Sequence, residues 1–125
     1  MLLLAATMLS SCSKKSNPAP KSTNVIEYDF SAIQTNDFVV IYQYGNNGGG
    51  AQTITNTNSW STKINLPDTT KTIYTSLSAA QEPPYTNNNS GTVTIKLNGK
   101  IVATGNGQFT NSQALAVASY TYNAN

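Results

Sequence analysis

The residues able to do chemistry are few. The chain of 125 residues contains one cysteine, Cys12, and five carboxylates, with no histidine and no arginine. Ser-His-Asp and Cys-His catalysis both require an imidazole base, so the composition excludes them. Zinc, haem and iron–sulfur sites lack their ligands, and one cysteine cannot form a disulfide within the chain. We therefore expect no cofactor and no metal.

Two of the carboxylates lie two positions apart. Glu27 and Asp29 fall in an alternating segment, which places them on one face of a strand about 7 Å apart. Paired carboxylates serve glycoside hydrolysis or bind calcium. A calcium loop would show several oxygen ligands within a few residues, as in D-x-D-x-D-G, and the sequence has no such run. We interpret the pair as a solvated strand face and predict no catalytic residue and no enzymatic activity.

The cysteine follows a short apolar run. Residues 1–9 read MLLLAATML, which is far shorter than the roughly 20 residues of a membrane-spanning helix and matches the apolar part of a secretory signal. Residues 9–12 (LSSC) resemble the lipobox of bacterial lipoproteins, whose cysteine is lipidated and becomes the new N-terminus. The resemblance implies a signal peptide at 1–11, acylation of Cys12 and anchoring in the bacterial envelope. Ser13, in place of an aspartate, favours the outer membrane. The alternative is a cysteine in an N-terminal core strand.

A polar tether follows the cysteine. Residues 13–23 read SKKSNPAPKST, with two prolines and no apolar periodicity, so we expect residues 12–23 to be flexible and extended. Eleven residues reach at most about 36 Å. The tether holds three of the seven lysines, which leaves the remainder of the chain nearly neutral. Without arginine or a dense basic face, the chain is not expected to bind nucleic acid.

From residue 24 onward the hydrophobic period is two, which is typical of strands. Strand-like runs occur at 26–30, 37–44, 52–55, 60–66, 71–79 and 115–122, while the glycine-rich 45–50 and the proline-containing 82–89 are expected to be loops. Two further runs flank Asn98-Gly99, the preferred pair for a type I′ hairpin turn, and pairing Leu97 with Lys100 would put Ile95 opposite Val102. No stretch has helical periodicity. The sequence predicts an all-β domain at 24–125, an antiparallel immunoglobulin-like β-sandwich of about seven strands.

The aromatic residues are candidates for a contact surface. The five of interest share faces with one another or border the glycine-rich run: Tyr42, Tyr44, Trp60, Tyr120 and Tyr122. Aromatic rings stack on sugars and anchor protein partners, and they also pack cores and sheet surfaces. Both interpretations stay open at the level of sequence.

The order of these segments resembles the β-sandwich domain of the MmpS family, small mycobacterial membrane proteins that act as transport accessories. The matching stretches are 26–30 (IEYDF), 38–53 (FVVIYQYGNNGGGAQT), 76–81 (SLSAAQ), 91–105 (GTVTIKLNGKIVATG) and 114–122. The resemblance implies an envelope domain that works by contact, with a transporter as partner. This chain differs in having a lipobox where MmpS proteins have a transmembrane helix.

Three hypotheses follow. The first is a lipid-anchored accessory or structural domain that binds another envelope protein, which an exposed apolar patch or a pairable edge strand would support. The second is a carbohydrate-binding module at the cell surface, which would require an aromatic row on one flat face. The third is a small hydrolase, which would require a concave pocket with at least two carboxylates.

Overall fold

The computed structural model describes residues 24–66, 72–86, 88–109 and 116–123. The expected signal peptide, Cys12 and the tether lie outside these residues. Six antiparallel strands make up most of the described chain: β1 (Asn24–Tyr44), β2 (Gly48–Leu66), β3 (Thr72–Gln81), β4 (Asn89–Leu97), β5 (Lys100–Phe109) and β6 (Ala116–Asn123). The described part of the chain contains no helix, and so none that could span a bilayer. The prediction of an all-β domain is confirmed.

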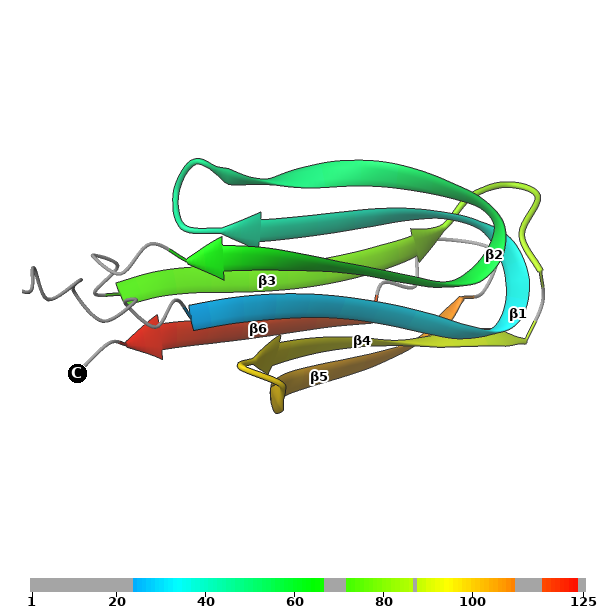
Figure 1. Ribbon diagram of the computed structural model, residues 1–125. Coiled ribbons are helices and arrows are strands. Elements are labelled where there is room, and N and C mark those ends of the chain that lie inside the picture. Colours follow the sequence, from blue (N-terminus) through cyan, green and yellow to red (C-terminus); the bar gives the residue numbers. More distant parts are fainter. Residues whose placement is uncertain (1–23, 67–71, 87, 110–115, 124–125) are drawn as a thin grey trace, which may run out of the picture.

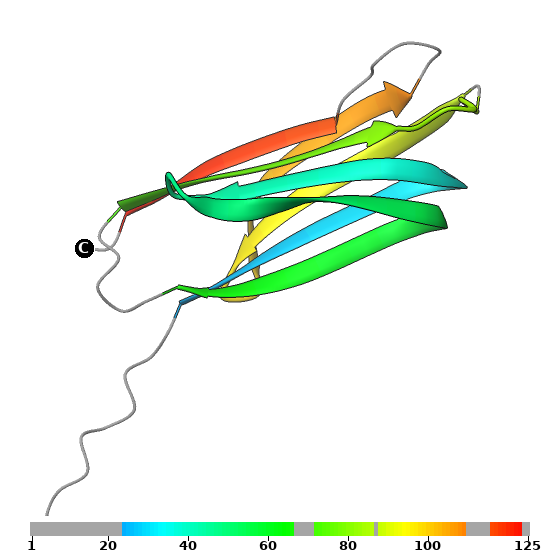
Figure 2. The same cartoon turned by 90° about the horizontal axis from the view of Figure 1, so that it is seen from above.

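All six strands belong to one sheet that bends back on itself (Figures 1 and 2). The strand order is β5-β4-β1-β3-β6, and β1 is the one described strand with which β2 pairs. The first half of β1 pairs with β4 and the second half with β3, while β2 follows β1 along both halves. The long β1–β2 hairpin thus contributes to both layers of a sandwich-like fold. The sequence suggested about seven strands, and the described residues form six. The runs 26–30 and 37–44 belong to one bent strand, β1, and the runs 52–55 and 60–66 both belong to β2.

The bend lies between Ser31 and Phe38, where the β1–β2 register shifts twice. Alternate residues of β1 point inward on both sides of the bend. The first half contributes Ile26, Tyr28 and Phe30, and the second contributes Phe38 and Val40, each at most 2% exposed. The rings of Phe30 and Phe38 meet edge-on at 4.8 Å, an arrangement that aromatic pairs favour. The two halves of β1 therefore face each other across the core, and buried residues of the other five strands complete it.

A buried amide connects the bend to its neighbours. Asn89 is fully buried at the start of β4. Its Oδ1 accepts a hydrogen bond from the Gln34 amide at 2.9 Å, and its Nδ2 donates to the Gln34 carbonyl at 3.2 Å and to Gln81 Oε1 at 3.0 Å. Two of these bonds satisfy the backbone groups of Gln34, which has no strand partner at the bend, as buried polar groups require.

The two ends of the sheet nearly meet. β5 and β6 have no hydrogen-bonded pairing within the described segments, yet a Cβ placed on Gly105 would lie 1.8 Å from the carbonyl oxygen of Val117. Only glycine allows the two backbones to approach this closely. The sheet is therefore almost closed on the β5–β6 side, whereas β2 borders the other side.

Three local predictions have different outcomes. The Asn98-Gly99 turn is confirmed, with Leu97 opposite Lys100 and positive φ values of 51° and 82°. Within that hairpin the expected pairing of Ile95 with Val102 is wrong, because a register shift places Ile95 opposite Ala103. The expectation of a glycine-rich loop over 45–50 is also wrong in part, since only residues 45–47 form the turn and β2 begins at Gly48.

Candidate functional site

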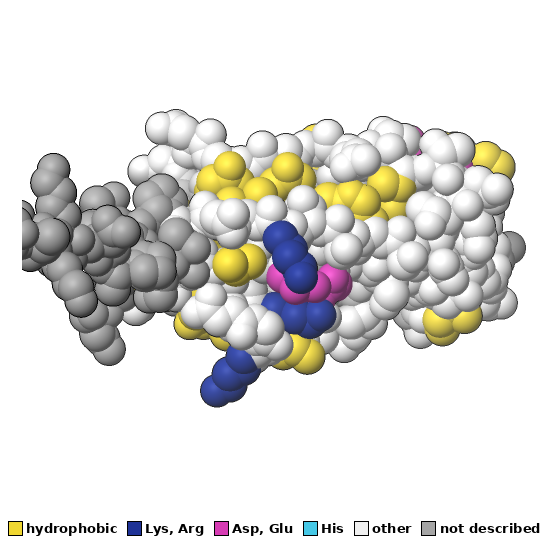
Figure 3. Space-filling view, in the orientation of Figure 1, with side chains coloured by type: hydrophobic (Ala, Val, Ile, Leu, Met, Phe, Trp, Pro, Cys, Tyr) yellow, Lys and Arg dark blue, Asp and Glu magenta, His cyan; other side chains and the backbone are white. Residues whose placement is uncertain are grey.

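The open side of the fold is bordered by β2. Three of the five predicted aromatic contact residues lie there: Tyr42 and Tyr44 on the second half of β1, and Trp60 on β2. With Ile64 they are half-buried and pack against the core. We call these four residues the β2 strip. Figure 3 shows hydrophobic side chains gathered along this hairpin, above a cluster of charged ones.

The strip joins the two halves of β2. The rings of Tyr42 and Trp60 lie 5.6 Å apart and are tilted by 36°. Trp60 Nε1 donates a 3.0 Å hydrogen bond to Oε1 of Gln52, which lies on the other half of β2. Behind them the hydroxyl of buried Tyr28 donates to the Gln43 carbonyl at 2.8 Å. Burial, with neighbouring Tyr44 and Tyr42, raises the pKa of Tyr28 and keeps its phenol neutral.

Two glycines shape the strip. Gly48 pairs with Tyr44 and Gly50 with Tyr42 across the hairpin. A Cβ on Gly48 would lie 2.2 Å from Cε2 of Tyr44, and a Cβ on Gly50 would lie 3.0 Å from the Tyr42 hydroxyl. The rings therefore lie over strand backbone that carries no side chains. This cross-strand pattern explains why the glycine-rich run is part of a strand.

The other two predicted contact residues are elsewhere. Tyr120 and Tyr122 lie on β6, which β3 and the second half of β1 separate from β2. The Tyr122 hydroxyl accepts a 2.7 Å hydrogen bond from Asn24 Nδ2 at the start of β1. The five aromatic residues thus do not form one flat row, which is the feature a stacking platform for sugars would need.

The paired carboxylates are held by lysines. Lys96 Nζ lies 2.6 Å from Asp29 Oδ2 and 3.5 Å from Glu27 Oε1, and Lys63 Nζ lies 3.3 Å from Glu27 Oε2. Partial burial opposes ionisation of Glu27, but hydrogen bonds and charge from Lys63 and Lys96 outweigh it and lower its pKa. The hydrogen bond to Asp29 raises the pKa of Lys96. Both shifts favour charged forms, so this cluster is an ion-pair network on the outer sheet face. The two carboxylates share that face, but their side chains are only 20% and 27% exposed.

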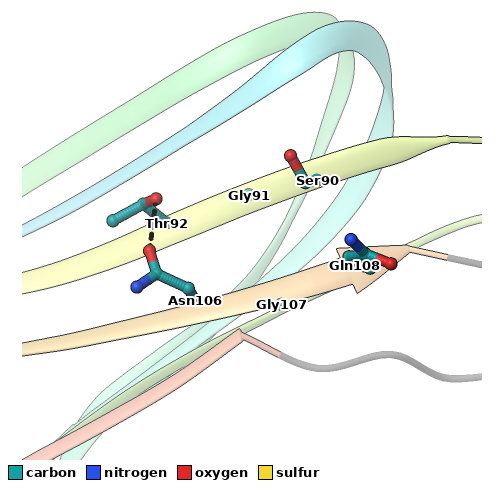
Figure 4. Close-up of a pocket in the computed structure, with 6 residues that line it drawn as sticks. All are labelled: Ser90, Gly91, Thr92, Asn106, Gly107 and Gln108. Atoms are coloured by element: carbon teal, nitrogen blue, oxygen red, sulfur yellow. Dashed lines mark hydrogen bonds between the residues drawn. The ribbon is translucent and has the colours of Figure 1, made fainter.

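A shallow depression lies between β4 and β5 (Figure 4). Ser90 and Thr92 border it on β4, and Asn106 and Gln108 border it on β5, with glycines between them. Thr92 Oγ1 donates a 2.8 Å hydrogen bond to Asn106 Oδ1. Sequence analysis missed this site, because its members are ordinary polar strand residues brought together by register. No group of three or more potential metal ligands occurs among the residues described.

Models of known protein families were searched, and none matches this chain. Curated protein sequences likewise contain no significant relative of it.

Proposed function

We propose that the chain is a non-catalytic accessory domain of the bacterial envelope, anchored through acylated Cys12, which binds another envelope protein along β2. One observation carries the binding surface: β2 is a 19-residue strand with one edge that no other described strand pairs, and half-buried aromatic rings border it. Exposed edges present rows of backbone donors and acceptors, and proteins normally blunt them with charges or prolines. β2 has no proline and a single charge, Lys63.

The chemistry of the surface fits a protein partner. Backbone groups of an edge strand bind an added strand, and the neighbouring side chains select it. The described carboxylates of the Glu27–Asp29 pair are bound in ion pairs, so they are unsuited to proton transfer. The resemblance to the MmpS family makes a transporter the partner we propose. We also propose that the bent sheet is an immunoglobulin-like sandwich, with the halves of β1 in its two layers.

Crosslinking in intact cells tests the binding surface. Photoreactive p-benzoylphenylalanine at Thr55, which is exposed on β2, should form adducts with an envelope protein. The same residue at Thr104, exposed on β5, is the matched control and should form none. Equal labelling from both positions would contradict the proposal.

The anchor has its own test. Cys12→Ala removes the only thiol that can carry acyl chains. Since two or three buried chains anchor a protein durably, the variant should move from the membrane fraction to the soluble fraction while its melting temperature stays unchanged. A variant that stays with the membrane would show that Cys12 is not the anchor.

A second candidate function rests on the β4–β5 depression. Its hydroxyl and amide side chains carry no charge, which is the chemistry that recognises neutral sugars. This supports a carbohydrate-binding module as the alternative. Chemical-shift mapping with N-acetylglucosamine oligomers tests it: shifts confined to Ser90, Thr92, Asn106 and Gln108 would favour the alternative, and a spectrum without shifts would exclude it for that sugar.

A further inference from the structure

The second half of β2 has the properties of a self-pairing edge. Residues 59–66 pair with β1 without interruption, from Ser59 opposite Ser31 to Leu66 opposite Asn24. Within the described part of the chain, no strand pairs with the outer edge of this segment. Its side chains alternate: Trp60, Thr62 and Ile64 face inward, while Ser61 and Lys63 are exposed on the outer face.

A second copy can pair here only in a few registers. Opposite residues in an antiparallel pair share a sheet face. The twofold axis must therefore lie midway between one residue and the same residue of the second copy, which is the residue on which the pair is centred. Centring the pair on Lys63 would place two ammonium groups opposite each other, which is unfavourable. Centring it on Ser61 would place Trp60 opposite Thr62 and would bring Ile64 to the bend.

Centring the pair on Thr62 matches the positions from Trp60 to Ile64. On the inner face, Trp60 meets Ile64 of the second copy, and the symmetry repeats this apolar pair. On the outer face, Lys63 meets Ser61 of the second copy. Since Ser61 pairs with Asp29 within its own chain, Lys63 then lies one strand away from a carboxylate of the second copy. Apolar and charged positions are both complementary in this register.

We propose that a second copy of this chain pairs antiparallel with residues 59–66 of β2 about a twofold axis at Thr62, extending the sheet across two molecules. The proposal rests on the proposed function and divides the β2 edge: a second copy takes residues 59–66, and the first half of β2 is left for the transporter.

The tether permits this arrangement. Antiparallel pairing puts the two Asn24 residues at opposite ends of the paired segment. Asn24 lies opposite Leu66 of its own chain, and Leu66 is four residues from the twofold axis at Thr62. At about 3.3 Å per residue they are separated by roughly 26 Å along the strands. Each tether of eleven residues reaches about 36 Å, so two copies lying along a membrane can both be anchored in it.

Disulfide trapping in cells tests the register. In an antiparallel pair, directly opposite Cα atoms are about 4.5–5.5 Å apart, which suits a disulfide. Thr62→Cys should therefore give a dimer on a non-reducing gel. The unmodified chain, with Cys12 alone, and Thr104→Cys on exposed β5 are the controls and should remain monomeric. Thr62→Cys with no more dimer than Thr104→Cys would overturn the proposal.

A charge pair separates dimerisation from folding. In the Thr62→Cys background, Ser61→Lys should lower the dimer yield about tenfold, because the lysine introduced in each copy then lies opposite Lys63 of the other copy. Ser61→Glu faces Lys63 with the opposite charge and should keep the dimer. Within one chain the effects are reversed, since a lysine beside Asp29 stabilises the monomer and a glutamate destabilises it. Equal dimer yields from both variants would contradict the Thr62 register.

The partner's identity is read from a third measurement. p-Benzoylphenylalanine at Ser61 in intact cells should give an adduct of twice the monomer mass. An adduct of another mass would overturn this inference and leave the proposed function intact. The absence of any adduct at Ser61 would also overturn this inference alone, because the proposed function is tested separately at Thr55.

Discussion

The β2 strip depends on glycine at position 48, and a double-mutant cycle measures that dependence. In Gly48→Ala the new methyl group would lie 2.2 Å from Cε2 of Tyr44 and 2.6 Å from two further ring atoms. Carbon atoms pack at about 3.5 Å or more, so the ring must move outward by more than an ångström. Tyr44 is half-buried beside solvent, and it can yield only by losing contact with the core.

The magnitude follows from that movement. If the ring loses about 60 Å² of buried area, the cost is about 1.5 kcal/mol at about 25 cal/mol per Å². The alanine also restricts the unfolded chain, which stabilises the fold by about 0.5 kcal/mol. We therefore expect Gly48→Ala to lower the free energy of unfolding by about 1 kcal/mol. In a Tyr44→Ala background the clash is absent, so the same change should stabilise the fold slightly.

Urea unfolding followed by the fluorescence of Trp60, the single tryptophan, measures all four corners of the cycle. The coupling free energy between positions 48 and 44 should be about 1.5 kcal/mol. Gly99→Ala is the control, since its Cβ would meet nothing within 4 Å, and it should be additive with Tyr44→Ala. If Gly48→Ala destabilises both backgrounds equally, the ring does not lie over the glycine and the structural reasoning fails.

Three further predictions concern the fold. Gly105→Ala should cost about 3 kcal/mol or prevent folding, because its Cβ would collide with backbone of β6; an unfolding midpoint equal to that of the native protein would refute the near-closure of the sheet. Asn89→Ala should cost about 2–4 kcal/mol, since three hydrogen bonds at the bend are lost; denaturant titration would refute the role of this amide if the loss stays below 1 kcal/mol. Tyr28 has a raised pKa in the fold and an ordinary value of 10.0 when unfolded. The contribution of its neutral phenol to the free energy of unfolding is therefore complete below pH 10 and is lost as the pH rises above 10. Tyr28→Phe should thus lose less stability than the native chain between pH 9 and pH 12, and parallel stability curves would contradict this.

Much of the fold could be predicted from local sequence. Alternation identifies the strand faces, because side chains on a strand have a period of two, and Ile73, Thr75 and Leu77 are buried as that period requires. Asn98-Gly99 determines its turn through positive φ values that few other residues adopt. These features depend only on near neighbours.

The bend in β1 could not be predicted, because it depends on distant contacts. Residues 31–36 (SAIQTN) contain neither glycine nor proline. What holds them is Asn89, 55 positions away from Gln34. The turn-like composition of 45–50 was misleading for a similar reason, since Tyr42 and Tyr44 cover the glycines only after the hairpin has formed.

The candidate site was predicted in part. The rings of Tyr42 and Trp60 come together at 5.6 Å, and Tyr44 lies two residues from Tyr42 on the same strand. Tyr120 and Tyr122 lie on a different strand. The alternation of side chains along a strand predicts which residues share a face of that strand, but it does not predict which strands become neighbours. The free edge of β2 is likewise a property of topology, and no local pattern marks it.

Hydrogen–deuterium exchange tests the central claim, that the edge of β2 binds a protein in the envelope. Amides of residues 59–66 should exchange more slowly in native membranes than in the detergent-solubilised, monomeric protein, because an added strand protects outward-facing amides. Amides of β4, which is paired on both sides, should exchange equally in the two samples. Exchange along β2 that is as fast in membranes as in the isolated monomer would contradict the account.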